Sequence, residues 1–168
     1  RYNPPWLLGL GLHDPFLEQG LSKLLQFVTH GHTASISGKL LTTSLEHLQL
    51  EIGSFTSIFS LDYSTYSILT SSTWLTFLWH FVCEHDIILS PSSPSRPQPL
   101  RVHDQALMDI FIAQHSLSKN ALQSINRVRC YFKVFSLADI ATGDGMRIRN
   151  NYKHATIGDT DSSWEWPM

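Results

Sequence analysis

Apolar residues recur every three or four positions in three stretches of the first half of the chain, which is the spacing of one face of an α-helix. Asp14 precedes a proline at the start of the first stretch, and Gly31 and Gly53 follow the first two stretches as helix stops. The pattern predicts helices over residues 15–30, 40–52 and 74–82. Residues 33–38 are predicted to form a polar turn, and residues 54–70 a loop with a short extended piece.

Prolines interrupt this pattern in the middle of the chain. Four of them fall between residues 90 and 99, where they remove backbone donors and fix φ, so a surface linker is predicted there. Beyond it, Asp104 is expected to cap a helix and Ser118 to begin another. A helical turn, a tight turn and a short strand are predicted to follow in that order, at residues 137–140, 142–145 and 146–149.

The predicted fold class is therefore mainly α, with a single irregular helical domain of about five to six helices and few or no strands. Either half alone would have a thin core, which favours one domain over two. The predicted organisation is one domain over residues 1–168, with helical subunits 14–89 and 103–150, a Pro/Ser-rich surface loop at 90–102 and a polar tail at 151–168.

Charge is distributed unevenly, although the net charge is only -2. Residues 119–153 carry seven Lys or Arg against two acidic residues, a local charge of +5, and the remainder carries -7. One interpretation is a solvated helix face, and the other is a surface that contacts a phosphate backbone or an acidic partner. The candidate nucleic-acid-binding residues are Lys119, Arg127, Arg129, Lys133, Arg147, Arg149 and Lys153.

Within the helix that begins near Ser118, Leu122 and Ile125 belong to the apolar face. Arg127, Arg129 and Lys133 are expected to lie mostly on the other side of this helix, where they could contact phosphates without reading sequence.

No catalytic, metal-binding or cofactor site is predicted. The histidine-containing groups are sparse for structural zinc, which usually needs four ligands in two close pairs; they are His30 with His32, and His80 with Cys83, Glu84 and His85. Asp139 and Asp144 flank a glycine turn, where a turn-forming or capping role is the simpler interpretation. An enzyme built on these two aspartates is the least favoured hypothesis.

Two cysteines, Cys83 and Cys130, lie in apolar stretches and form no disulfide framework, which favours an intracellular, reducing compartment. No apolar run approaches the ~18 residues of a transmembrane helix, so no membrane association is expected. The first residue, Arg1, is not an initiator Met, and no signal-peptide pattern follows it, so we expect a segment of a longer protein.

Several phrases together resemble a known kind of protein segment: WLLGLGLHDPFL at 6–17, TTSLEHLQLEIG at 42–53, WLTFLW at 74–79, INRVRC at 125–130 and LADIATGDG at 137–145. They resemble a segment of large retroelement-like open reading frames of microalgae such as diatoms, located downstream of a reverse transcriptase domain. The resemblance extends from about residue 5 to residue 167. It implies no catalytic residue in this chain.

Two roles follow from this resemblance. The first is a non-catalytic accessory segment that contacts the RNA or DNA backbone of a template–primer, beside an upstream reverse transcriptase domain. The second is a structural or protein-interaction module that packs on the polymerase or self-associates, with no nucleic-acid contact; the apolar segments at 6–8 and 164–167 favour it.

Overall fold

The computed structural model of the protein describes residues 14–31, 33–89, 97–114 and 116–153, and these residues are mainly helical. They include two 3-10 turns and, as the only strand-like pairing, two isolated bridges. This confirms the predicted mainly α fold class. The helices are α1 (Pro15–His30), α2 (Ile36–Ile52), α3 (Tyr63–Tyr66), α4 (Trp74–Glu84), α5 (Leu107–Ala113), α6 (Lys119–Tyr131), α7 (Leu137–Ile140) and α8 (Asn150–Lys153), and the 3-10 turns are η2 (Ile58–Ser60) and η3 (Ser67–Leu69).

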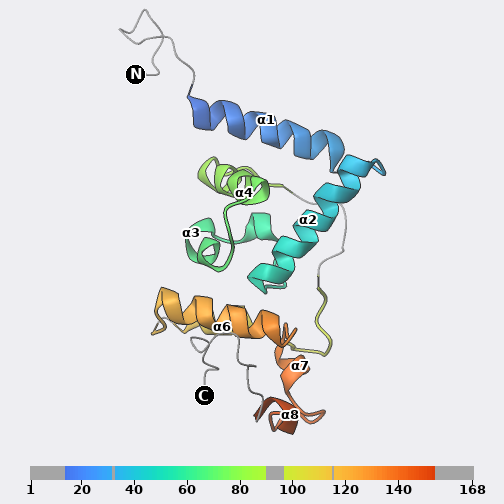
Figure 1. Cartoon of the computed structure of the whole chain (residues 1–168), viewed down its shortest axis with the longest axis vertical. Coiled ribbons are helices and arrows are strands. Elements are labelled where there is room, and N and C mark those ends of the chain that lie inside the picture. Colours follow the sequence, from blue (N-terminus) through green and yellow to red (C-terminus); the bar gives the residue numbers. More distant parts are fainter. Residues whose placement is uncertain (1–13, 32, 90–96, 115, 154–168) are drawn as a thin grey trace, which may run out of the picture.

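The helices are arranged along one long direction (Figure 1). At one end α1 packs on α4 and on the start of α2, and α2 then runs toward the middle of the molecule. There its last turn meets α6, while α7 and α8 lie at the opposite end. The described parts of the chain before and after the linker are therefore in direct contact.

Local signals explain where the long helices begin and end. Asp14 accepts a hydrogen bond from the Phe16 N–H at 2.9 Å, and Gly53 ends α2 in the left-handed conformation at φ 76°. The prediction that residues up to 38 form a turn is wrong in its second half. Ser35 accepts from the Gly38 N–H at 3.1 Å, so the cap lies at Ser35 and α2 begins directly after it.

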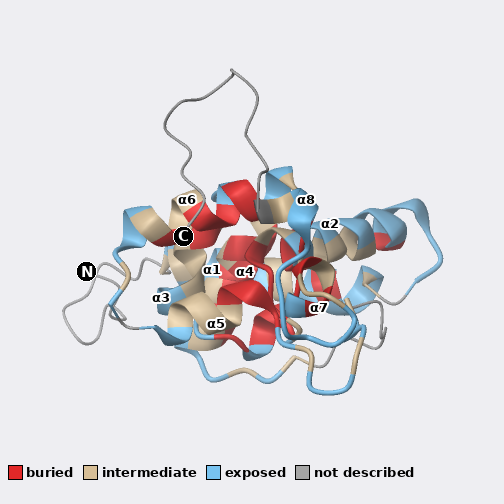
Figure 2. Cartoon of the chain, turned by 90° about the horizontal axis from the view of Figure 1, so that it is seen from below, coloured by how far each residue is buried: buried red, intermediate tan, exposed pale blue. Residues whose placement is uncertain are grey.

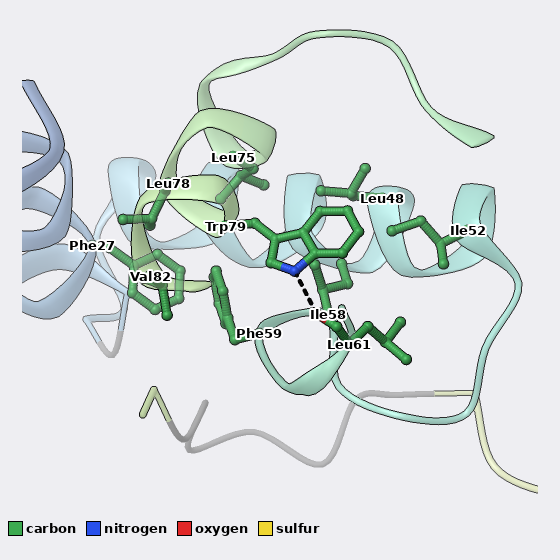
Figure 3. Close-up of a cluster of buried hydrophobic side chains, with 10 residues drawn as sticks. All are labelled: Phe27, Leu48, Ile52, Ile58, Phe59, Leu61, Leu75, Leu78, Trp79 and Val82. Carbon is green, nitrogen blue, oxygen red and sulfur yellow. Dashed lines mark hydrogen bonds between the residues drawn. The ribbon is translucent and has the colours of Figure 1, made fainter. Parts of the chain in front are cut away.

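The larger core surrounds Trp79 of α4, whose indole N–H donates to the Leu61 carbonyl at 2.9 Å (Figure 3). Side chains from α1, α2, η2, the residue after η2 and α4 itself pack around it: Phe27, Leu48, Ile52, Ile58, Phe59, Leu61, Leu75, Leu78 and Val82. The prediction of a loop with an extended piece over 54–70 is wrong, because this segment forms η2, α3 and η3. Short turns of this kind place apolar residues inward without a 3.6-residue period.

A second cluster joins the two halves of the chain. Leu69, at the end of η3, packs with Met108 of α5 and with Leu122 and Ile125 of α6. Buried positions accordingly line the face of α6 that points into the molecule (Figure 2). Because neither half supplies this cluster alone, each half completes part of its core against the other.

The start of the second half differs from the prediction. Asp104 does not cap α5, which begins at Leu107 after Ala106 without a side-chain cap. Instead, the Asp104 carboxylate accepts from the Ala138 N–H at 3.0 Å, in the first turn of α7. The predicted strand at 146–149 is also wrong: its pairing is a single bridge between Ala141 and Ile148.

The linker and the tail are described only in part. Residues 90–96 and 154–168 lie outside the described residues, as do the apolar segments at 6–8 and 164–167. Residues 97–102 are without helix or strand, and residues 151–153, at the start of the predicted polar tail, belong to α8. None of the helices in the described ranges combines the length and the hydropathy that crossing a membrane requires.

Candidate functional site

Arg129 is buried, with only 3% of its surface exposed, so the prediction that it lies on the outer side of α6 is wrong. Its guanidinium Nη2 donates to the carbonyls of Leu50 and Glu51 at 2.7 and 2.8 Å, and its Nη1 to the Val134 carbonyl at 3.3 Å. Asn126 accepts two further bonds from the same guanidinium, at 2.8 and 3.0 Å. Arg129 is thus occupied by the protein itself and is not available to a phosphate.

The guanidinium reaches these carbonyls because α2 ends in glycine. A Cβ at Gly53 would lie 2.8 Å from the Arg129 Cζ and 2.9 Å from the Met108 Cγ, closer than packed atoms approach. A cation at the C-terminus of α2 also interacts favourably with the helix dipole. Burial lowers the pKa of the guanidinium, and the neighbouring Cys130 and Glu51 oppose this shift.

Other candidate cations remain at the surface. Lys119, Arg127 and Lys133 are exposed, and Lys119 and Arg127 are separated by eight residues, or about 12 Å along the axis of α6. Lys133 follows α6 in the left-handed conformation at φ 53°. Lys153 belongs to α8. The structure therefore spreads these cations along and beyond α6.

A basic hollow lies at the far end of the molecule from α1. Arg101 and Arg147 both line a cavity of about 340 Å³, and the Arg101 guanidinium donates to the Thr142 carbonyl at 2.8 Å. Arg149 is two residues after Arg147, and its guanidinium donates to the Ala141 carbonyl at 2.9 Å. Sequence reasoning missed Arg101, because it precedes Arg147 by 46 residues and only the fold brings them together.

A carboxylate also links the two halves of the chain. Asp109 of α5 accepts from the Ser54 hydroxyl at 3.0 Å and from the Tyr66 hydroxyl at 2.9 Å. Burial raises the pKa of Tyr66, and the hydrogen bond to Asp109 and the charge of that carboxylate raise it further. Both Asp109 oxygens therefore have protein donors, which is typical of a structural contact.

A groove of about 870 Å³ runs along α2. Its apolar lining comes from α2 and from the start of α4: Leu40, Leu41, Leu48, Trp74 and Leu75. The polar positions around it include Gln26 and His30 of α1 and His47 and Glu51 of α2. Lys and Arg are absent from the lining formed by the described residues, so the only formal charge there is the carboxylate of Glu51.

The residues considered for metal binding or catalysis have other partners. His80 stacks on Tyr63 with ring centroids 4.5 Å apart, and His85 packs against Phe81 at 4.5 Å. Within the described ranges, no three potential metal ligands come together. His32, one of the candidates, lies outside those ranges.

The two aspartates near the glycine turn hold local backbone. Asp139 accepts from the N–H groups of Phe135 and Ser136 at 2.6 and 2.9 Å, at the start of α7. Asp144 accepts from the Met146 N–H at 3.1 Å within the turn. These bonds account for both carboxylates as capping and turn-forming groups.

Comparisons with known proteins add nothing to this geometry, since no protein-family model, no curated protein and no solved structure matches the chain. The surfaces themselves must therefore carry the functional argument. The groove along α2 and the basic hollow near Arg101 are two surfaces of the described residues whose chemistry can be stated.

Proposed function

We propose that this chain is a non-catalytic accessory module of a retroelement-type protein, and that it binds an amphipathic segment of a partner protein in the groove along α2. The sequence resemblance supports the retroelement context. The single observation that carries the mode of action is the groove itself, where the exposed Leu40 and the half-buried Leu41 and Trp74 lie beside a polar rim.

The size and shape of the groove suit this occupant. Its volume of about 870 Å³ lies within the usual range of ligand sites, and its walls come from α1, α2 and the start of α4. Amphipathic helices commonly bind in such clefts through apolar side chains on one face. Trp74 and Leu40 offer an aromatic and an aliphatic contact for these side chains.

The charge of the groove favours a protein segment over a nucleic acid. Glu51 is negative, and its carboxylate accepts a hydrogen bond from the Thr70 hydroxyl at 2.8 Å, which leaves acceptor capacity for a donor from outside. The described lining offers no Lys or Arg to a phosphate backbone. A segment that presents apolar side chains with a Lys or Arg at one edge fits the chemistry best.

Titration calorimetry with the polymerase domain of the same reading frame tests this proposal. Leu40 is 63% exposed and lines the groove, so Leu40→Asp should leave the fold intact and weaken binding by at least about tenfold, because a charge would be buried against apolar side chains.

Ile36 offers the matched control for this experiment. It lies one turn earlier on α2, is 81% exposed and is not part of the groove lining, so Ile36→Asp should bind like the wild type. Equal binding by Leu40→Asp and the wild type, or no binding by the wild type, would show that the groove does not serve this partner.

The second candidate function is contact with a nucleic-acid backbone, and the basic hollow lined by Arg101 and Arg147 favours it. Binding of duplex and single-stranded oligonucleotides should then be detectable at ~50 mM salt and fall steeply as salt rises. Charge reversal at Arg147 should remove most of this binding. If the chain binds neither oligonucleotide at low salt, this second function is wrong.

A further inference from the structure

The basic hollow beside α7 combines two kinds of side chain, at the end of the molecule opposite α1 (Figure 1). Its cations are Arg101 and Arg147, and His103 in the same lining can add a positive charge when it is protonated. Large apolar side chains that the described residues leave exposed form much of the remaining wall: Val102, Leu137, Met146 and Ile148. Cations and uncovered apolar surface therefore occur together in one hollow of about 340 Å³.

Hydrogen bonds fix the two segments that form this hollow on either side of α7. On one side, the Leu137 N–H donates to the Gln105 carbonyl at 3.0 Å, which ties the segment after Arg101 to the start of α7. On the other side, the Thr142 N–H donates to the Arg147 carbonyl at 2.7 Å. The Arg101 guanidinium joins the two sides through its bond to the Thr142 carbonyl. The walls are thus in place before a ligand arrives, which reduces the cost of binding.

The arginines around the hollow have no carboxylate partner. Among the described residues, no ion pair joins a carboxylate to Arg101, Arg147 or Arg149. The guanidiniums of Arg101 and Arg149 bond instead to carbonyls within residues 138–142. Carbonyls accept hydrogen bonds but carry no formal charge, so the positive charge of these arginines is not neutralised. A group of such cations attracts anions.

Two aspartates lie close to the hollow, and both are held by donors of the chain itself. Asp104, in the lining, accepts one backbone N–H on each of its carboxylate oxygens. Asp144 accepts from the Met146 N–H at 3.1 Å and from the Thr142 hydroxyl. The bond from Thr142 lowers the pKa of Asp144, and the charge of Arg101 lowers it further. Asp144 therefore competes with an incoming anion for the field of Arg101.

We infer that the basic hollow binds a phosphate monoester carried on an apolar or aromatic group, a ligand of about the size of one nucleotide. Arg147 binds the phosphate oxygens, since guanidinium forks match phosphate geometry. Arg101 supplies further N–H donors, because a guanidinium has several of them and one bonds to the Thr142 carbonyl. The apolar or aromatic group lies against Met146 and Ile148.

This ligand differs from the strand backbone of the second candidate function. A volume of about 340 Å³ is at the small end of the range for small-molecule sites, so it suits one compact molecule. A phosphodiester of a strand carries a single negative charge, whereas a terminal phosphate carries up to about two at neutral pH and more acceptor oxygens. A terminal phosphate therefore interacts more strongly with the two arginines of the lining.

Titration calorimetry of the full chain with adenosine monophosphate at ~150 mM salt tests the inference. The nucleotide should bind, and adenosine and inorganic phosphate should each bind at least about tenfold more weakly, because each lacks one of the two contacts. Absence of nucleotide binding would overturn the inference, and so would equal binding by adenosine or by inorganic phosphate.

Arg147→Gln and Arg127→Gln form a matched pair for this experiment. Both arginines are exposed and both substitutions remove one positive charge, but Arg127 lies on α6 and is not part of the lining. Arg147→Gln should weaken binding of adenosine monophosphate by at least about tenfold, and Arg127→Gln should bind it like the wild type. Equal weakening by the two variants would indicate general charge attraction and contradict the inference.

Asp144→Asn provides a gain of affinity, which a damaged fold cannot imitate. The amide oxygen can still accept from the Met146 N–H, while the negative charge near Arg101 is removed. Adenosine monophosphate should then bind several-fold more tightly. Unchanged or weaker binding by Asp144→Asn would count against a phosphate site beside Arg101.

Short oligonucleotides distinguish the two sources of such a phosphate. Binding of a 5′-phosphorylated trinucleotide as tightly as adenosine monophosphate would identify a strand end, and binding of the mononucleotide alone would identify a free nucleotide; either result supports the inference. Equal binding of phosphorylated and unphosphorylated trinucleotides would overturn it in favour of backbone contact. None of these results depends on what binds in the groove along α2.

Discussion

Arg127 and Arg129 lie two positions apart on α6, carry the same charge and occupy different environments. Arg127 is exposed, whereas Arg129 is buried and donates to the last carbonyls of α2. Loss of a buried guanidinium leaves those carbonyls without donors, which is costly in a low-dielectric interior. Loss of an exposed one has little effect on stability.

The two arginines give a charge-matched prediction. Arg129→Ala should lower the free energy of unfolding by about 3 kcal/mol or more, and Arg127→Ala should change it by no more than about 0.5 kcal/mol. Urea denaturation followed by far-ultraviolet circular dichroism measures both. Similar effects of the two substitutions would show that the hydrogen bonds of Arg129 do not stabilise the fold.

The position of Arg129 was predictable from its spacing but not from its charge. It lies seven residues after Leu122 and four after Ile125, so the helical period places it on the buried face. Its charge predicts the opposite, because arginines are rarely buried, and this favours the outer side of α6 for Arg129. Arg129 can be buried because carbonyls at the end of α2 accept its hydrogen bonds, and only the folded chain brings these carbonyls next to α6.

At the scale of the helices, the close crossing of α1 and α4 depends on one small residue, Gly20. A Cβ at Gly20 would lie 2.0 Å from the Phe81 Cδ2, and Phe81 is 1% exposed and has no room to move. The helices approach closely here because Gly20 has no side chain. Farther along the same contact, Lys23 places its ammonium 3.8 Å from the centre of the Phe77 ring.

Gly20→Ala separates helix propensity from packing. Propensity alone predicts a gain of about 1 kcal/mol from this substitution, whereas the clash predicts a net loss of about 1–2 kcal/mol. Ser22→Ala, at an exposed position of the same helix, serves as the control and should be neutral or stabilising. Thermal denaturation of both variants measures the sign, and a stabilising Gly20→Ala would contradict the close crossing.

Elements with a repeated apolar period were predictable, and so was the helical turn at residues 137–140, which is α7. The short turns within residues 54–70 were not predictable. α1 and α6 begin directly after the predicted starts Asp14 and Ser118, and α4 begins at the predicted residue 74, because local start signals and the period agree. η2, α3 and η3 span three or four residues each, too few to show a period. The sequence places Asp104 next to α5, but one of its carboxylate oxygens accepts from the Ala138 N–H, 34 residues away.

At the scale of the whole molecule, the basic hollow and the contacts between the halves were beyond sequence reasoning. Each depends on residues that are far apart in the chain, such as Arg101 with Arg147, or Ser54 with Asp109. The charge distribution indicated a basic second half, yet it could not show that Arg129 would be buried within it.

The Tyr66–Asp109 hydrogen bond joins the two halves of the chain, and its contribution to the free energy of unfolding should depend on pH in the alkaline range. Because the pKa of Tyr66 is raised in the folded state above its ordinary value of about 10, its contribution is fully present below pH ~10 and declines as the pH rises further. Tyr66→Phe lacks this contribution.

The measurement is urea denaturation of both proteins between about pH 8 and about pH 11. The stability advantage of the wild type over Tyr66→Phe should shrink across that interval, because the two proteins differ only in the Tyr66 hydroxyl. An advantage that is constant with pH would exclude the bond as a pH-sensitive contact.

The contact between Arg129 and Leu50 also has a consequence for the order of folding. The two residues are separated by 79 positions, so a long loop must close before the guanidinium reaches its carbonyl. Helices α1, α2 and α6 contain only local hydrogen bonds and can form much earlier. The junction of α2 and α6 is therefore expected to form after the folding transition state, and its hydrogen bonds govern how slowly the native protein unfolds more than how fast it folds.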